Sequence, residues 1–404
     1  MPTLKSFHDT AQDLGQDVSN LKPGESVTST ITILNFQQLK DLLKDTATPA
    51  MRAERTRSMF GRFPNSSDLT DISAAATLHR VEAALYGDHE LSSDDEARIA
   101  SVFPMSLNCV SITEKTLAPG EQWNLTAPDP VCLNIGKLTM EAGSSIIIRS
   151  TVLNLTIGTL IRNGGDHPGP GYDLGILGAT GDTGKTGDTG PNGNVGGIGK
   201  SGWCSSVGVV GGAGETGGTG TKGITGGSGG TGGPAKPSQS ATITINGITG
   251  SLAKFVIYTK SGTGGAGGAG GTGGVGGRGG TGGAGVTCDC TGSGAGNGGR
   301  GGTAGRGGTG GVGAPAADGS TIYVNVPKGL GKLIIKQPGG SVPPGLGGRG
   351  GLPGTAGGGG TGGVGGKNNG NASPGGTGPG AVAGVTGPDG TYYGKPADIK
   401  IDEH

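Results

Sequence analysis

Residues 264–285 have the sequence GGAGGAGGTGGVGGRGGTGGAG, in which glycine holds two of every three positions. Two further stretches keep glycine at every third position, from Gly175 to Gly202 and from Gly345 to Gly366. A flexible glycine linker has no reason to keep such a phase. Three residues per turn is the period of the polyproline-II helix, which rises about 3.1 Å per residue and makes no internal hydrogen bonds. The phase therefore predicts polyproline-II-type helices that bond to neighbouring segments through their glycine faces.

The runs differ in how many bare faces they offer. The run 175–202 has the pattern Gly-X-Y, with one face lacking side chains, whereas 264–285 has Gly-Gly-X, with two. A helix with two bare faces can contact neighbours on two sides, so we expect the first run at an edge and the second in the centre of a two-layer bundle. A collagen triple helix normally needs Pro or hydroxyproline, and 175–202 contains only Pro191.

Glycine also marks the main domain boundary. Of the 96 glycines, 88 follow residue 162 and 8 precede it. We expect a multidomain chain with a small, mostly α-helical attachment module at 1–104, a β-rich bridge at 105–162 and a glycine-rich bundle of polyproline-II/polyglycine-II helices at 163–404. Within 1–104, four arginines at 52, 55, 57 and 62 suggest a flexible linker or docking surface.

A weak repeat in the β-rich bridge has a period of 23 residues. It matches Ile112, Thr116, Leu117 and Gly120 with Ile135, Thr139, Met140 and Gly143. Such a period favours stacked solenoid coils, and a small β-sandwich is the alternative.

Strand pairs recur inside the glycine-rich region, near 241–259 and 320–336, and a last strand is expected at 397–402. The two regions resemble each other when Ile243 is aligned with Ile322 and Ile245 with Val324. Each strand region is followed by a glycine tract. The tracts are therefore interpreted as three excursions that leave a shared β platform and return to it.

Charge and hydropathy set limits on partners and location. Thirty basic and 30 acidic residues balance, which argues against a general nucleic-acid or anionic-membrane binder. No apolar run approaches the length that a membrane-spanning helix needs, so we expect no membrane-spanning segment. The first residues lack the apolar core of a secretory signal. We expect a protein that is cytoplasmic before release and extracellular or virion-associated afterwards, exported without a classical signal peptide.

The glycine-rich part, over about 170–395, resembles two families. The first is the glycine-rich adhesins at the tips of phage tail fibres, which have an attachment domain, a sandwich of polyglycine-II helices and tip loops that bind bacterial surface receptors. The second is the springtail-type glycine-rich antifreeze proteins, whose runs look like residues 273–283 of this chain. The resemblance implies a rigid polyglycine-II scaffold that serves binding.

Interruptions of the glycine phase are the places where specific recognition can sit. The candidate receptor-binding residues lie in or beside these interruptions: Trp203, Cys204, Tyr172, Thr287, Cys288, Asp289, Cys290, Asn368 and Asn369. Five cysteines are too few for a disulfide framework. A bridge is considered between Cys109 and Cys132, and another from Cys204 to the Cys288 region.

No catalytic, cofactor-binding or metal-binding residues are predicted. The many Gly-x-Gly-x-x-Gly matches follow from the period of three and lack the strand–turn–helix context of a dinucleotide site. The leading hypothesis is a non-catalytic adhesin that binds a cell-surface glycan or protein and joins a carrier or fibre through its N-terminal module, as part of a phage fibre or an exported host-interaction or toxin factor. The alternatives are an ice-binding protein with a flat face of Thr, Ala and Val, and a self-assembling filament or matrix subunit. A homo-oligomer is compatible with each.

Overall fold

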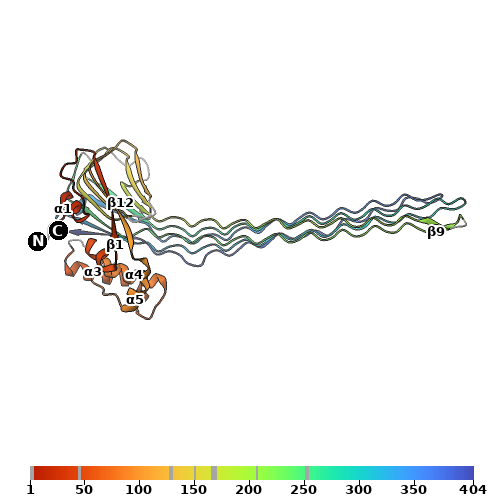
Figure 1. The fold of residues 1–404 in the computed structure, drawn as a ribbon, viewed down its shortest axis with the longest axis horizontal. Coiled ribbons are helices and arrows are strands. Elements are labelled where there is room, and N and C mark those ends of the chain that lie inside the picture. The colour runs from red at the N-terminus through yellow and green to blue at the C-terminus, as the bar shows by residue number, and fades with distance from the viewer. Residues whose placement is uncertain are drawn as a thin grey trace.

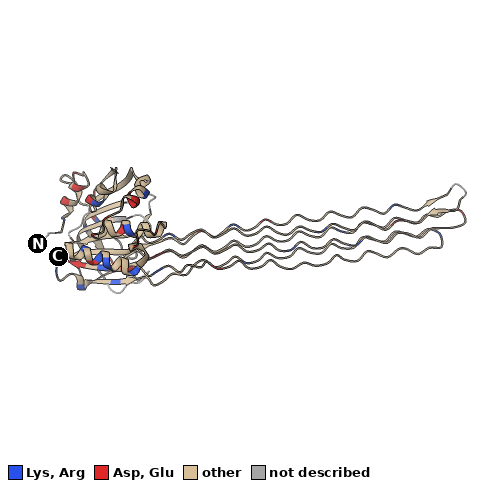
Figure 2. Ribbon diagram, turned by 90° about the horizontal axis from the view of Figure 1, so that it is seen from below, with Lys and Arg blue, Asp and Glu red and all other residues tan. Residues whose placement is uncertain are grey.

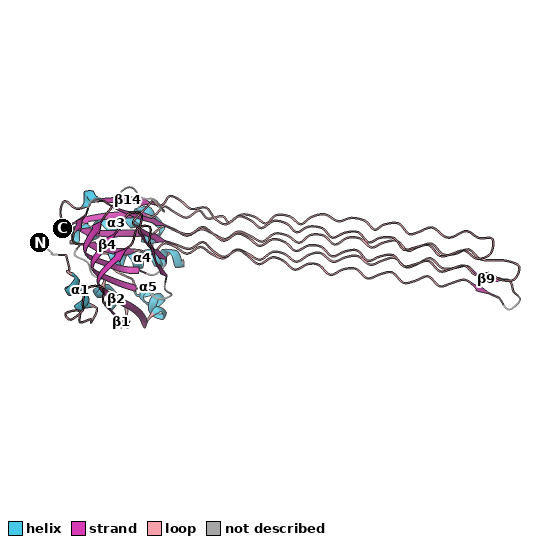
Figure 3. Ribbon diagram, turned by 90° about the horizontal axis from the view of Figure 1, so that it is seen from above, coloured by secondary structure: helices cyan, strands magenta, loops and turns pink. Residues whose placement is uncertain are grey.

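The computed structural model describes residues 4–43, 47–126, 131–149, 152–164, 171–205, 208–250 and 254–404. The molecule has a head, which holds both chain ends, and a long thin rod that projects from it (Figure 1). Helices and the two large sheets lie in the head, and nearly all of the rod has neither helix nor strand (Figure 3). Charged residues stand out in the head and are sparse along the rod (Figure 2). The chain is thus β-rich with a few helices and several sheets, as expected.

The helices of the head all lie in the first hundred residues. They are α1 (Phe7–Asp13), α2 (Phe36–Leu42), α3 (Pro49–Arg62), α4 (Ala74–Tyr86) and α5 (Ser93–Ile99), with short 3-10 turns η1 (Pro64–Ser67) and η2 (Ala100–Val102). Side-chain caps begin several of them: Thr48 accepts from Met51 N–H at α3, and Ser73 accepts from Ala76 N–H at α4. The expectation that the arginine-containing stretch 52–62 is flexible was wrong, because these residues form most of α3.

Two sheets form the rest of the head. The first has the order β1-β2-β4-β6-β10-β13-β15, with β11 beside β6, and the second has the order β14-β12-β7-β5-β3. The strands of the first sheet are β1 (Ser26–Ile33), β2 (Met105–Leu117), β4 (Val131–Met140), β6 (Val152–Arg162), β10 (Ala241–Ile245), β11 (Ile248–Thr249), β13 (Thr321–Val326) and β15 (Asp398–Glu403). The strands of the second sheet are β3 (Gln122–Thr126), β5 (Ser145–Arg149), β7 (Leu174–Leu177), β12 (Phe255–Lys260) and β14 (Ile334–Pro338), preceded by the turn η3 (Gly331–Leu333).

The sheets are the two faces of a parallel solenoid. The chain passes from the first sheet to the second in each coil, and every pairing within them is parallel except that of β1 with β2. The register pairs Ile112 with Ile135 and Leu117 with Met140. The 23-residue period is therefore one coil, and the solenoid interpretation is confirmed over the sandwich. Apolar side chains from both sheets fill the space between them.

The expected alignment of Ile243 with Ile322 between later coils was wrong. In the structure β10 pairs with β13 so that Ala241 lies beside Ile322 and Ile243 lies beside Val324. The true register thus differs from the expected one by two positions along the strand. Such a shift keeps every side chain on its face of the sheet, so the apolar pattern alone does not distinguish the two registers.

Glycine tracts are inserted between successive coils. Six tracts make up the rod: tract 1 (178–202), tract 2 (213–236), tract 3 (261–285), tract 4 (294–317), tract 5 (343–366) and tract 6 (371–393). Each odd-numbered tract leaves the head and the next even-numbered tract returns, which gives three long hairpins (Figure 1). The three excursions from a β platform are present as expected.

Hydrogen bonds join the tracts at every third residue. Tracts that run in the same direction bond side by side: Gly181 donates to Thr263 O at 3.0 Å and Gly217 to Asn297 O at 2.9 Å. Bonds between opposite directions tie outbound to returning tracts, as from Gly268 to Gly230 O at 2.8 Å. Tracts 1, 3 and 5 thus form one layer and tracts 2, 4 and 6 the other.

Close packing explains which tracts have two glycines in each triplet instead of one. Tract 3 bonds to tracts 1, 2, 4 and 5, whereas tract 1 bonds only to tracts 2 and 3. A Cβ at Gly280 would lie 2.7 Å from Gly196 O, and a Cβ at its neighbour Gly279 would lie 2.8 Å from Gly360 N. No side chain fits at either position, whereas Gly197 on tract 1 has nothing within 4 Å of its Cβ position.

The helical segment packs directly on the solenoid. Tyr86 of α4 stacks on Tyr323 of β13, with ring centroids 5.2 Å apart, and Arg55 of α3 pairs with Asp402 of β15. Leu14, which directly follows α1, and residues from α2 and α4 share an apolar cluster with β1, β2, β4 and β13. The helices therefore cover the outer face of the first sheet, where they form an apolar cluster separate from the core between the two sheets.

Candidate functional site at the rod tip

Three loops far apart in the sequence meet at the end of the rod that is farthest from the head. They are the hairpin of β8 (Trp203–Cys204) and β9 (Val210–Gly212), the turn 286–293 and the turn 367–370 (Figure 1). Hydrogen bonds between the tracts hold the chain on both sides of each loop in register. The tip is therefore built on a rigid base.

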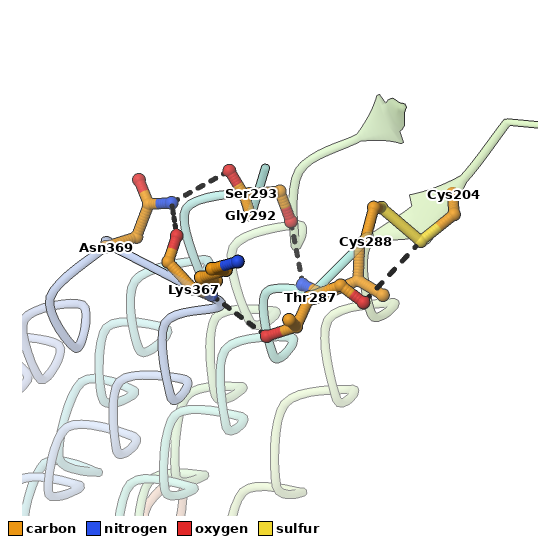
Figure 4. The surroundings of a disulfide bond; sticks show 8 residues. Cys204, Thr287, Cys288, Gly292, Ser293, Lys367 and Asn369 are labelled. Carbon is orange, nitrogen blue, oxygen red and sulfur yellow. Dashed lines mark hydrogen bonds between the residues drawn. A yellow bond between two sulfur atoms is a disulfide. The ribbon is translucent and has the colours of Figure 1, made fainter. Parts of the chain in front are cut away.

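A disulfide joins the first two loops. Cys204 bonds to Cys288, with Cα atoms 5.9 Å apart, and the two residues are separated by 84 positions (Figure 4). The second of the two considered bridges is thus present. The Cys109–Cys132 bridge is wrong, since both residues are buried free thiols that lie side by side in register on β2 and β4. Neighbouring strands are about 4.8 Å apart, which exceeds the usual Cβ separation of about 3.8 Å in a disulfide.

Trp203 is the main aromatic group of the tip. Its side chain is 61% exposed. A Cβ at Gly211 would lie 2.7 Å from indole Cη2, and a Cβ at Gly212 would lie 2.7 Å from Nε1. The indole therefore rests on a glycine backbone that only this residue type can provide, and it stays largely open to solvent.

A polar network ties the second loop to the third. The Lys367 N–H donates to Thr287 Oγ1 at 2.9 Å, and Asn369 Nδ2 donates to Gly292 O at 2.8 Å (Figure 4). Lys367 Nζ also donates to Asp289 O at 3.3 Å. Asn368 has a φ of +62°, a left-handed conformation that Asn tolerates better than most residues.

Two further predicted residues are exposed beside the disulfide. The Asp289 carboxylate lies near Gly208 of the first loop, where a Cβ would be 3.0 Å from Oδ2. Cys290 is a free, exposed thiol. Residues 206 and 207, which complete the first loop, lie outside the described residues. The tip thus presents an aromatic ring, a carboxylate, an ammonium group and amides on one small surface.

Tyr172 is the one predicted site residue that the structure places elsewhere. It is buried in the head, where its ring stacks on Tyr258 with centroids 5.0 Å apart. The prediction was wrong because β7, which starts at Leu174, still belongs to the solenoid, so Gly175, the first glycine of the period, precedes the rod. Residues 165–170, which precede Tyr172, lie outside the described residues.

A cluster of titratable groups at the base of the rod was missed by sequence reasoning. His79 stacks on Phe63 at 3.7 Å, and its Nε2 lies 4.0 Å from the Asp318 carboxylate. Burial lowers the pKa of His79 to about 4, and burial raises the pKa of Glu82 to about 7 although Ser240 Oγ donates to it. The spacing of His79 and Glu82 on one helical face was the available signal. Their partners Asp318 and Ser240 come from the returning chain.

Among the residues that the structure describes, no group of three or more His, Cys, Asp or Glu side chains is arranged to hold a metal ion. Within the same residues no helix has the length and apolar character to cross a membrane. Comparisons with family models, curated proteins and solved structures found no match to this chain.

Proposed function

We propose that this protein is a non-catalytic receptor-binding protein whose tip loops contact a cell-surface glycan or protein. The observation that carries the proposal is the meeting of three loops, from residues 203–212, 286–293 and 367–370, at the end of the rod opposite to the head. Loops held by a rigid base are a common location for binding residues. The exposed Trp203 gives this surface the type of residue that most often dominates binding energy.

The six tracts, in this proposal, are polyglycine-II helices. The support is the hydrogen bonding at every third residue together with the absence of helix and strand in the described tracts. At about 3.1 Å per residue, a tract of about 25 residues carries the tip roughly 75 Å from the head. The head then serves as the part that joins a carrier or fibre.

The tip disulfide supports release into an oxidising environment, because structural disulfides persist mainly outside the cytosol. We therefore place the working protein outside the cell or on a virion. The chain in this view acts after release.

The test is binding to whole cells or to a glycan array with the full chain. Trp203→Ala should lower binding at least tenfold, because truncating a central aromatic anchor costs about 2 kcal/mol or more. Val195→Ala, which changes an exposed residue on the side of the rod, is the matched control. Equal binding by the two variants and the unmodified protein would refute the proposal that the tip contacts the receptor.

Ice binding is a second candidate, and one observation favours it. Hydroxyl groups of neighbouring tracts pair on both layers of the rod: Thr263 donates to Thr180 and Thr361 to Thr281, each at 3.2 Å, and Thr309 donates to Ser228 at 2.9 Å on the opposite layer. The full chain should then show thermal hysteresis that Thr281→Tyr lowers and that Leu34→Tyr, at an exposed residue of the head, leaves intact. A chain without hysteresis would exclude this function.

A further inference from the structure

Three cations lie in a row on one outer face of the rod, on the layer formed by tracts 2, 4 and 6. Two of them are Arg300 and Arg306 of tract 4, in which every third residue from 297 to 312 is exposed. The third is Lys222 of tract 2. Charged residues are sparse along the rod (Figure 2), so three charges of one sign on the same face are a local feature.

The register between the two tracts places the lysine midway between the arginines. Successive N–H groups of tract 2 donate to the carbonyls of Arg300, Thr303 and Arg306, each at 2.9 Å. The middle donor is Gly223, which directly follows Lys222. Lys222 is therefore level with Thr303. At about 3.1 Å per residue, neighbouring cations are separated by about 9 Å along the rod.

A hydrogen bond between side chains shows that both tracts present these residues on the same side. Thr309 Oγ1 donates to Ser228 Oγ at 2.9 Å. Ser228 follows Lys222 by two repeats of three residues, and Thr309 follows Arg306 by one. Lys222, Arg300 and Arg306, here called the cation row, are exposed, and no ion pair among the described residues engages them. Their charges are therefore available to an anion from solution.

Acidic side chains do not border the cation row. Tracts 2, 4 and 6, all of which the structure describes, contain two acidic residues, Glu215 and Asp389. The Asp389 carboxylate accepts from Gly347 N–H of tract 5 at 2.7 Å, so it lies where tract 6 meets the opposite layer. Glu215 is out of phase with Lys222 in the repeat of three. The exposed positions of tract 2 that are in phase with Lys222 hold threonine or serine, at 216, 219, 225, 228 and 231.

We propose that this face binds a linear anionic polysaccharide that lies along the rod, with a carboxylate or sulfate group at each member of the cation row. Hydrogen bonds from Arg or Lys to an anionic oxygen are among the strong ones in proteins. A straight row of separated cations fits a polymer whose charges are also separated, such as a chain with an acid on every second sugar. The hydroxyl groups between the cations can bond to the sugar hydroxyls. The inference goes beyond the proposed tip contact, because it assigns a second binding surface on the side of the rod.

Spacing and composition argue against a nucleic acid on this face. Phosphates follow one another at about 3.4 Å along one strand of a DNA duplex, which is much closer than the spacing of the cation row. Proteins that bind single strands use aromatic side chains on which the bases stack. Neither tract 2 nor tract 4 contains an aromatic residue. A polysaccharide needs neither the dense charge nor the stacking surface.

The experiment measures binding of a fluorescein-labelled hyaluronan oligosaccharide to the full chain by polarisation at low salt. Hyaluronan has one carboxylate on every second sugar, and the oligosaccharide is long enough to span the cation row. A neutral dextran of equal length, a single-stranded oligo(dT) and anionic phosphatidylglycerol vesicles are compared with it. Hyaluronan should bind at least tenfold more tightly than dextran and oligo(dT). Its affinity should fall with added salt, because exposed charges are screened.

Charge-removing variants locate the binding. Arg300→Gln and Lys222→Gln should each weaken hyaluronan at least threefold, and each should lower the slope of log affinity against log salt by about one, the share of one contact. Arg300→Lys, which keeps the charge, should retain most of the affinity. Arg278→Gln, which removes an exposed charge from tract 3 on the opposite layer, is the matched control and should bind as the unmodified chain does. Circular dichroism checks that each variant is folded.

Several outcomes would overturn the inference. They are equal affinity for dextran and hyaluronan, equal losses in Arg300→Gln and Arg278→Gln, tighter binding of oligo(dT) than of hyaluronan, or tighter binding of the anionic vesicles. The probe is a purified polysaccharide, so each of these outcomes leaves the tip contact to be decided by cell binding of Trp203→Ala.

Discussion

Replacing Gly280 by Ala tests whether the rod depends on contact between backbones. Gly280 lies in tract 3, where its N–H donates to Gly218 O at 2.8 Å and its carbonyl accepts from Gly299 N–H at 2.8 Å. A Cβ there would lie closer than 3.0 Å to the carbonyl oxygens of Gly196 and Gly197. Tract 1 must therefore move away from tract 3, and the bonds on both sides of the contact lengthen.

The size of the effect follows from the bonds that are disturbed. Three inter-tract hydrogen bonds at about 1 kcal/mol each give a loss of about 3 kcal/mol. The gain from a less flexible unfolded chain offsets about 0.5–1 kcal/mol of this, so Gly280→Ala should destabilise the rod by about 2 kcal/mol. Gly197→Ala is the matched control, because nothing lies within 4 Å of its Cβ position, and it should stabilise slightly.

Native-state hydrogen exchange measures both variants. The amides of Gly196 and Gly199, which donate from tract 1 to Arg278 O and Thr281 O of tract 3 at 2.8 Å, should exchange about 30-fold faster in Gly280→Ala, since about 2 kcal/mol corresponds to that factor. The same amides should keep their protection in Gly197→Ala. Equal protection in the two variants would refute the view that doubled glycine serves close packing. The high glycine content of the central tracts would then have no explanation in the packing of the rod.

Three other variants test the tip and the head. Cys204→Ser removes the bridge to Cys288, which closes a loop of about 84 residues. The loss should lower the free energy of unfolding, measured by urea melts, by up to about 4 kcal/mol. Urea melts would show no change if the loop were already ordered in the unfolded chain. Asp173→Ala leaves the fully buried Arg162 without its carboxylate and should cost about 3–5 kcal/mol by the same assay, so a loss below about 1 kcal/mol would contradict the pairing. Glu82 has a pKa raised from 4.5 to about 7, so it favours the folded state below pH 4.5, and this contribution is lost as the pH rises through 7. Glu82→Gln should therefore be more stable than the unmodified chain at pH 8, by up to about 3 kcal/mol, and a pH-independent difference between the two would contradict this assignment.

The sequence predicted those features that depend on short-range repetition. The 23-residue period placed Ile112 beside Ile135, because a solenoid coil repeats its own contacts. The interruptions at Trp203 and Cys288 identified the tip, since each tract has to turn somewhere. What failed depended on long-range packing. Tyr172 was misplaced because the glycine period starts within the last strand before the rod.

Buried charges were the other gap in the sequence reasoning. The residues next to Arg55 in the sequence give no sign that its side chain is buried. Its partner Asp402 reaches it only because the chain returns to the head at β15. In the same way, Glu82 meets Ser240 where the first hairpin re-enters the head. The partners in these two pairs are 347 and 158 positions apart in the sequence, so the local sequence does not predict either pair.

The bonding of every tract to its neighbours at each third residue also restricts how this molecule can change in length. Three extra residues in one tract would have no partners in the tracts beside it, and the excess would bulge out or shift the tip. A longer rod needs one triplet in all six tracts, which is about 18 residues for a gain of about 9 Å. Reach is therefore quantised, and lengths between these steps are not available to a rod of this design.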